Sequence, residues 1–271
     1  TSLLGDGIAA VLDTSFTAPV VEELVKALAL FFLFLAFYKE FDGVLDGIVY
    51  GALVGFGFAL TENVFYFLNA FDSGGFGQWG MVVLLRTVVF GLNHALFTSI
   101  VGAGLGLIRY RMAVWQRILI PLLALLLAMT LHGIHNLFAQ LNDILCGAIL
   151  VSLISDWGGV VVIVVIAVLS WRREKTWIVL ELADEVRRGF LTGPEYGLVQ
   201  SPLHRLGARW DAWGSGGWTA YSRLGRFFQL VTDLAFKKHQ ARTMGDEGGN
   251  LAEIEHLRKQ IADLRRGETR R

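Results

Sequence analysis

Four apolar segments of this sequence each contain a short group of ionisable or amide side chains, and this pattern limits the folds available to the chain. Such side chains are costly in hydrocarbon, so they occur in apolar helices when they face a protein interior and have a function. Two of the groups are acidic and two contain histidine, which predicts one hydrolytic or metal site where four helices meet. The groups are Glu22-Glu23 with Lys26, Glu62-Asn63, His94, and His132 with His135 and Asn136.

The composition places the first part of the chain in a membrane. Of the 271 residues, 54% are hydrophobic, and the mean hydropathy is +0.52, which excludes an ordinary soluble domain. Residues 1–170 carry 6 basic and 11 acidic side chains, whereas residues 171–271 carry 18 and 13. The sequence therefore predicts an all-α protein, with a polytopic transmembrane helical bundle over residues 1–171 and a soluble helical region over residues 172–271.

Five apolar segments are predicted to cross the membrane, and the first four are long enough for a hydrocarbon layer about 30 Å thick. Residues 142–155 are too short to cross and are predicted to be half-inserted or interfacial. In the soluble region, residues 222–242 and 251–266 have apolar side chains at helical spacing and are predicted to pair as a hairpin. The predicted spans are residues 19–38, 44–68, 80–108, 117–141 and 155–171.

Small residues recur at every fourth position of the second span, at Gly43, Gly47, Gly51 and Gly55. Without side chains at these positions, a neighbouring helix can approach closely. Glu62 lies seven residues after Gly55 and therefore projects from nearly the same helical face. We expect Glu62 to point into the bundle rather than toward lipid.

The basic residues indicate the orientation of the chain in the membrane. Three arginines lie in the loop at residues 109–117, and the region after residue 171 begins with further basic residues, whereas residues 69–79 and 141–159 contain no Lys or Arg. By the positive-inside bias, the arginine loop and the C-terminal region are predicted to be cytoplasmic. The polar groups then lie in the outer half of a multi-pass protein of the cell membrane.

His132, His135 and Asn136 share one helical face, because they are three and four residues apart. A carboxylate can take a proton from water, and a histidine can share that task or bind a metal ion that activates the water instead. Histidine and asparagine can also donate hydrogen bonds to an oxyanion. A zinc ion with an open coordination position would suit ligands drawn from Glu62, His94, His132 and His135. The residues leave both chemistries open.

Three motifs on successive spans resemble a known series. Glu22-Glu23-x-x-Lys26, Phe90-x-x-x-His94 and His132-x-x-x-Asn136 are similar to the motifs of the CAAX-protease and bacteriocin-processing superfamily. With Glu62-Asn63 between them, the series most resembles the PrsW family of intramembrane proteases. The resemblance covers roughly residues 17–140. Prenyl-protein relatives carry an arginine one residue after the position of Lys26, so prenylated CAAX substrates are not expected.

The resemblance implies a role for each group of residues. Glu22 or Glu23 would activate water together with His94, and His132 with Asn136 would hold the oxyanion. Glu62 and His135 would be additional members of the site. The family is often called a metalloprotease, which implies zinc as a cofactor that the motifs themselves do not establish.

The resemblance also implies the partners and the location of the protein. The substrate would be a membrane-anchored protein, since members of the family are implicated in cutting membrane-bound anti-sigma factors on the extracytoplasmic side. The protein would lie in the lipid bilayer of a bacterial cell membrane, with no nucleic-acid partner.

Two other classes of function are consistent with the same polar groups. A proton- or cation-coupled transporter would also bury Glu and His at mid-membrane, but the sequence shows no convincing internal repeat of the kind such transporters contain. A non-catalytic, substrate-binding scaffold of the same fold is the nearer alternative. The presence of both glutamates and all three histidines favours the enzyme.

Overall fold

The structure, a computed structural model, describes residues 9–38, 41–110, 112–141, 145, 147–246 and 249–266. Arg111 of the predicted cytoplasmic loop and the single cysteine, Cys146, lie outside the described residues. Every regular element within the described residues is a helix and none is a strand, which confirms the all-α prediction. The chain divides into two compact units, Thr1–Leu169 and Ser170–Arg271.

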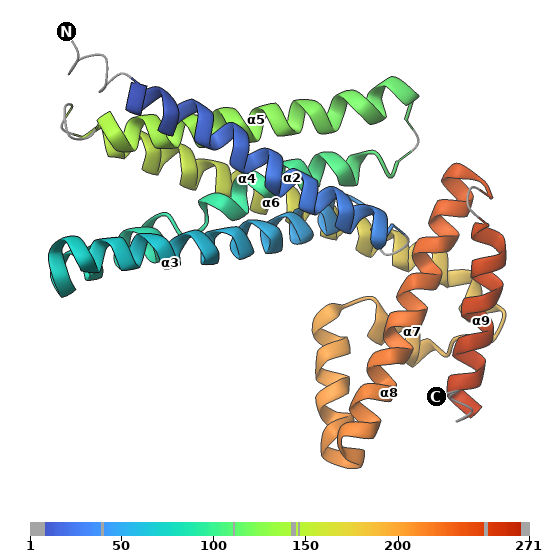
Figure 1. Ribbon diagram of the computed structural model, residues 1–271. Coiled ribbons are helices and arrows are strands. Elements are labelled where there is room, and N and C mark those ends of the chain that lie inside the picture. The colour runs from blue at the N-terminus through green and yellow to red at the C-terminus, as the bar shows by residue number, and fades with distance from the viewer. Residues whose placement is uncertain are drawn as a thin grey trace, which may run out of the picture. The chain divides into compact units, whose positions relative to one another are not determined.

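The first unit is a bundle of long, apolar helices (Figure 1). Among the described residues, three helical segments are long and apolar enough to cross a membrane: Val44–Leu107, which comprises α3, η2 and α4, Val114–Leu141 and Ala148–Arg187. The elements of this unit are the π-helical turn η1 (Asp13–Thr17), α2 (Ala18–Ala36), α3 (Val44–Leu84), the π-helical turn η2 (Leu85–Val89), α4 (Asn93–Leu107), α5 (Val114–Leu141) and the first part of α6 (Ala148–Arg187).

Helix α5 matches the fourth predicted span, but α3 extends beyond the second one to Leu84, and the third, residues 80–108, is divided among the end of α3, η2 and α4. Two further differences concern the first and the last predicted spans. Helix α2 matches the first predicted span in position. Its three charged residues, Glu22, Glu23 and Lys26, distinguish it from the three segments named above. Helix α6 runs without interruption from Ala148, so residues 148–155 continue into the fifth predicted span instead of forming a separate segment. The reason is that Gly158 and Gly159 keep a helical backbone, and the Asp156 carboxylate accepts hydrogen bonds inside the bundle.

Helix α3 reverses direction in its last third. Gly74 and Gly75 have non-helical backbone angles, and Gly75 has a φ of 62°, in the left-handed region that favours glycine. The chain beyond this point turns back along the first half of α3. Arg86, which follows in η2, therefore contacts Glu62 and Asn63 more than twenty positions earlier in the sequence.

The glycine series of α3 packs directly against the backbone of α4. A Cβ atom built on Gly47 would lie 2.0 Å from the Gly102 carbonyl oxygen, and one built on Gly55 would lie 2.2 Å from the His94 carbonyl oxygen. These separations are shorter than any normal non-bonded contact, so only glycine fits. The predicted close helix approach is confirmed, and it places His94 against the helix that carries Glu62.

The second unit is helical and has its own apolar core. Helix α8 is interrupted at Gly217, where φ is 65°, and residues of α8 and α9 pack together in one buried cluster that includes Val231, Leu234, Ile254 and Ile261. This packing confirms the predicted pairing of the last two helical segments. The elements are the end of α6, α7 (Gly193–Val199), α8 (Pro202–Met244) and α9 (Asn250–Arg266).

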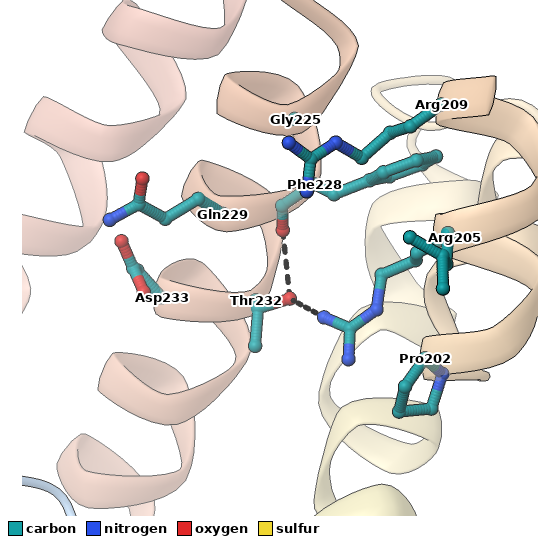
Figure 2. A pocket seen from close by; sticks show the side chains of 9 residues that line it. Pro202, Arg205, Arg209, Gly225, Phe228, Gln229, Thr232 and Asp233 are labelled. Atoms are coloured by element: carbon teal, nitrogen blue, oxygen red, sulfur yellow. Dashed lines mark hydrogen bonds between the residues drawn. The ribbon is translucent and has the colours of Figure 1, made fainter. Parts of the chain in front are cut away.

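Polar contacts also hold the second unit together. Glu185 is 1% exposed and accepts hydrogen bonds from Lys238 and Arg258. A pocket of about 430 Å³ is lined by residues from both parts of α8. The Arg205 guanidinium donates to the Thr232 hydroxyl there at 2.8 Å, and Figure 2 shows this hydrogen bond.

Substituting Gly51 by alanine is expected to destabilise the first unit. A Cβ atom at this position would lie 2.5 Å from the Thr98 carbonyl oxygen, so α3 and α4 must separate, at a cost of about 1–3 kcal/mol. Gly57→Ala is the matched control, because a Cβ there meets nothing within 4 Å. Unfolding of the two purified variants in detergent measures the difference. Equal stability of both variants would contradict the close packing of α3 on α4.

Candidate active site

The first turns of α2 carry a buried cation. Lys26 is 1% exposed, and its Nζ donates to Glu23 Oε1 at 2.8 Å and to Glu22 Oε2 at 3.3 Å. The spacings of three and four residues place the three side chains on adjacent positions of one helical surface. Lys26 Nζ also lies 2.8 Å from His94 Nδ1 of α4. A buried ammonium needs such partners, since its desolvation is costly, and this one joins α2 to α4.

The two adjacent glutamates have different surroundings. Neighbouring residues of a helix project about 100° apart, so Glu22 and Glu23 face different sides. The Glu23 side chain is fully buried, whereas that of Glu22 is 21% exposed. The Glu23 carboxylate contacts His132 of α5, with 2.9 Å between Oε1 and Nδ1. Glu22 lines a cavity instead.

His94 is held from both of its ring nitrogens. An ammonium group can only donate, so Nδ1 accepts from Lys26 and the proton is on Nε2. His94 Nε2 lies 2.9 Å from Glu62 Oε2 of α3. Glu62 in turn accepts from Arg86 Nη2 at 2.5 Å, while Arg86 Nε donates to the Asn63 side chain at 2.6 Å. The predicted inward direction of Glu62 is what the structure shows.

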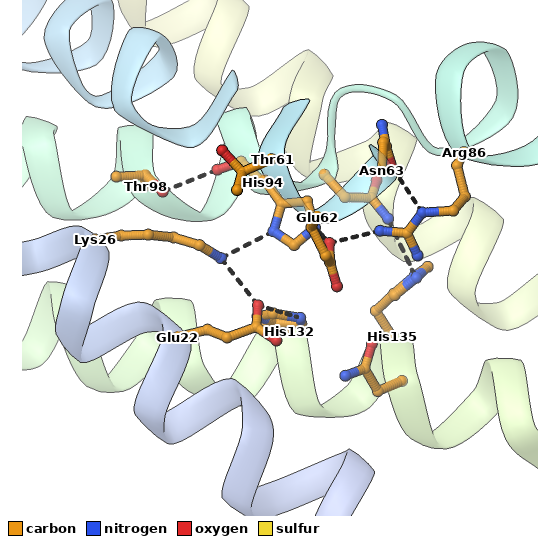
Figure 3. A network of polar contacts seen from close by, with 12 residues as sticks. Glu22, Lys26, Thr61, Glu62, Asn63, Arg86, His94, Thr98, His132 and His135 are labelled. Atoms are coloured by element: carbon orange, nitrogen blue, oxygen red, sulfur yellow. Dashed lines mark hydrogen bonds and ion pairs between the residues drawn. The ribbon is translucent and has the colours of Figure 1, made fainter. Parts of the chain in front are cut away.

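His132 of α5 lies close to both glutamates of α2. It is 3% exposed and stacks on Phe97, with ring centroids 4.9 Å apart. Its Nδ1 contacts Glu23, and its Nε2 lies 3.9 Å from Glu22 Oε2. The His132 ring also meets the edge of the His94 ring at 5.3 Å. Figure 3 shows these side chains directed toward one another from different helices.

His135 and Asn136 follow His132 along α5 but have other polar partners. His135 Nδ1 lies 2.7 Å from Asp156 Oδ2 of α6. The Asn136 amide donates to the Thr14 carbonyl oxygen of η1 at 2.9 Å. The three residues that share a face in the sequence therefore contact three different elements.

These residues surround one cavity of about 140 Å³. It has room for a few water molecules. Its wall combines carboxylate, imidazole, guanidinium and amide groups with aromatic rings. The lining residues are Thr14, Ala18, Glu22, Glu62, Tyr66, Arg86, Phe90, Asn93, His94, Phe97, His132, His135 and Asn136.

The sequence reasoning missed three polar residues of this region. Arg86, Asn93 and Asp156 lie in or beside apolar helices, which is the same signal that singled out the other groups. Asn93 directly precedes His94 and is 5% exposed, and Asp156 is 2% exposed. No role was predicted from the sequence for either Asp156 or Arg86. The occurrence of each of these polar residues in or beside an apolar segment was a sufficient signal to include it among the predicted site residues.

One set of side chains is suited to hold a metal ion. The ligand atoms of Glu22, His94 and His132 lie within 4.8 Å of one another. The set differs from the predicted ligands, because Glu22 joins the two imidazoles while Glu62 is bound by Arg86 and His135 by Asp156. One carboxylate and two imidazoles are a donor set found in catalytic zinc sites, so the residues fit zinc by type, although a metal ion on His94 would have to displace Lys26 or Glu62 from one of its ring nitrogens.

The fold and the site define a class of protein: a polytopic helical membrane protein with a glutamate–histidine centre inside its bundle. Sequence comparison agrees with this class. The family described as "PrsW family intramembrane metalloprotease" matches residues 1–172, which is more than half of the chain, and the protein belongs to this family. The predicted resemblance is confirmed.

Two curated relatives are each named Protease PrsW. The protein of Geobacillus kaustophilus is 33% identical over 142 residues, covering 49% of this chain and 56% of the relative. The protein of Oceanobacillus iheyensis is 33% identical over 125 residues, covering 46% and 53%. The chain thus spans about half the length of these relatives. No solved structure matches the chain significantly.

Removing the buried cation is expected to destabilise the first unit strongly. Lys26→Met would leave the Glu23 carboxylate buried without its ammonium partner, at a cost of about 3–5 kcal/mol. Lys175→Met is the control, because Lys175 is exposed and its loss should change stability by less than about 0.5 kcal/mol. Unfolding in detergent compares the two. A Lys26 variant as stable as the control would show that the ion pair does not support the bundle.

Proposed function

We propose that this protein is an intramembrane endopeptidase that hydrolyses a peptide bond of a membrane-anchored protein. The observation that carries the proposal is the convergence of Glu22, His94 and His132 on one small cavity, although they lie on α2, α4 and α5. Hydrolysis inside a membrane requires a water-accessible hollow with a base and hydrogen-bond donors. Membership of the family and the names of the two relatives support the same activity.

Glu22 is the proposed base. It lines the cavity and retains some exposure, so it can meet a water molecule and take its proton, whereas Glu23 is fully buried. Glu23 acts through His132, which it orients by the contact at Nδ1. His94, held between Lys26 and Glu62, lines the same cavity and positions the attacking water together with Glu22 when its Nε2–H turns from Glu62 to that water.

His132 and Asn136 are the proposed donors to the oxyanion. Both line the cavity. His132 donates when both of its ring nitrogens carry protons, because Nδ1–H is bound to Glu23 and only a protonated Nε2 can face the oxyanion. The Asn136 amide has two N–H groups, of which one donates to Thr14 and the other can donate to the oxyanion. Arg86 and Glu62 support His94 from the opposite side of the cavity.

Zinc fits the same centre as an additional component. Glu22, His94 and His132 would hold it, and the ion would polarise the scissile carbonyl and make the bound water more acidic. Lys26 Nζ lies among these donors, and its positive charge opposes the entry of a cation. The family description as a metalloprotease supports a metal ion such as zinc, so zinc-dependent and metal-free hydrolysis are two alternatives.

The orientation of the bundle determines near which side of the membrane the substrate is cut. The arginines of residues 109–117 and the basic start of the second unit favour a cytoplasmic location for both. The cavity then lies in the outer half of the membrane, and the substrate is cut near the extracytoplasmic side. Residues 1–171 would form the protease in a bacterial cell membrane, and residues 172–271 a cytoplasmic helical region.

Substitution of the three converging residues should abolish cleavage. In liposomes that contain the full chain and a single-span reporter protein, Glu22→Gln, His94→Ala and His132→Ala are each expected to lower kcat/KM by at least about 100-fold, the contribution of a positioned acid or base. Gel electrophoresis and mass spectrometry of the reporter measure cleavage. Asp72→Asn, an exposed acidic residue of α3, is the control and should retain activity.

The same assay separates the alternatives. A wild-type chain that binds the reporter without cutting it would indicate a non-catalytic scaffold. Full activity of Glu22→Gln together with loss of activity in Glu23→Gln would reverse the proposed roles of the two glutamates.

Metal removal distinguishes zinc-dependent from metal-free hydrolysis. If zinc takes part, the purified wild type is expected to contain about one zinc per chain, to lose activity with a chelator and to regain it with added zinc. His132→Ala should then reduce the zinc content, while Asp72→Asn should not. Unchanged activity of a chain shown by elemental analysis to be free of metal would exclude the zinc-dependent form.

A further inference from the structure

Asp156 is an acidic residue that the proposed reaction does not use. It lies on α6 and is 2% exposed. Its Oδ2 is 2.7 Å from His135 Nδ1 of α5 and 3.0 Å from Asn93 Nδ2 of α4. The Ser155 hydroxyl lies 3.4 Å from the other oxygen, Oδ1. The Asp156 carboxylate therefore accepts hydrogen bonds from residues of three helices, α4, α5 and α6.

A carboxylate in this position is costly unless it has a task. The surrounding segment of α6 is among the most apolar in the chain, and an unpaired acidic group there would be strongly destabilising. Acidic residues inside membrane helices usually face a functional cavity or its supporting residues. Asp156 does not line the cavity, but His135 and Asn93, its two closest partners, both do.

The contact with Asp156 determines the state of the His135 ring. An ionised carboxylate only accepts hydrogen bonds, so the proton of the neutral imidazole is on Nδ1. Nε2 points away from Asp156 and carries a lone pair. Asn93 Nδ2 lies 3.1 Å from Nδ1 and 3.4 Å from Nε2, and it donates to Asp156 Oδ2 at 3.0 Å, so a substrate N–H can replace the longer contact at Nε2. The Phe90 ring, 5.0 Å from the His135 ring, limits its rotation.

We propose that Asp156 is a positioning residue that fixes His135 as a hydrogen-bond acceptor for a backbone N–H of the substrate peptide in the cavity. This inference rests on the proposed function. A peptide segment in an apolar bundle brings N–H groups that have left water and must find acceptors. Most cavity groups beside Glu22 either donate or are already paired, so His135 Nε2 supplies an acceptor next to the reaction centre.

The proton position can be tested without any substrate. The full chain, labelled with 15N-histidine and held in lipid nanodiscs, is examined by NMR, and the His135 signals are assigned from their loss in His135→Gln. The expected result is a neutral ring with the proton on Nδ1 and none on Nε2. A proton on Nε2, alone or together with one on Nδ1, would overturn the proposal.

Two substitutions of Asp156 separate hydrogen bonding from charge. Both hydrogen bonds end on Oδ2, and the donor on Asn93 favours an oxygen there, so Asp156→Asn keeps an acceptor in place. Asp156→Asn should retain the Nδ1–H form, and Asp156→Leu should lose it. Loss of the Nδ1–H form in Asp156→Asn would show that the negative charge of Asp156, and not its acceptance of a hydrogen bond, holds the proton on Nδ1. The positioning role proposed for Asp156 would then be wrong.

Kinetics of the single-span reporter test the substrate contact. Asp156→Leu and His135→Leu are expected to raise KM about two- to tenfold, the loss of one hydrogen bond, with kcat within about twofold because the contact is equal in the ground and transition states. His135→Gln and Asp156→Asn should stay near the wild-type KM. Ser99→Ala, a buried polar residue bonded to the Ile48 carbonyl oxygen, is the control.

The outcomes distinguish this proposal from the proposed function. If wild type cleaves the reporter and the Leu variants keep its KM, or lower kcat alone, the acceptor role of His135 is wrong while the protease stands. If wild type does not cleave the reporter, the protease proposal and the substrate contact are both wrong, and the NMR result still decides whether Asp156 sets the His135 proton.

Discussion

The burial of one ammonium group organises the first unit. Lys26 is surrounded by apolar helices, and its charge is compensated by Glu22 and Glu23 on its own helix and by His94 on α4. Removing one partner of such a buried group leaves an uncompensated charge. The same contacts that make the burial of Lys26 possible bring α2 against α4 and hold two carboxylates beside the cavity. Structural support and site geometry therefore depend on one interaction.

Around this centre, each of the three histidines that line the cavity is bound by a second polar residue. His132 is oriented by the fully buried Glu23, and His94 by Lys26 and Glu62. His135 is bound in the same way by Asp156. An imidazole has two nitrogens, so one can bind a supporting carboxylate while the other faces a ligand. This arrangement fits a site in which several groups must keep fixed directions in an apolar interior.

Much of the fold follows from local patterns, and these were predictable. The apolar runs indicated the membrane helices, and the glycine series indicated that α3 meets another helix backbone to backbone. Arg86 and Asp156 were not assigned a role, because their partners lie 24 and 21 positions away in the sequence. The reversal of α3 at Gly75 and the uninterrupted course of α6 create those contacts, and neither follows from the periodicity of a single helix.

The sequence by itself determined the helical class, the apolar spans, the four polar groups and the family, since each depends on composition or on spacings within one helix. Only the tertiary structure decided which groups meet. It placed Glu22 in the cavity and Glu23 behind it, and it brought the ligand atoms of Glu22, His94 and His132 within 4.8 Å of one another, while Glu62 is bound by Arg86 and His135 by Asp156. The physical reason is that a rotation of about 100° separates adjacent helical residues, and only the packing of neighbouring helices sets which side faces inward.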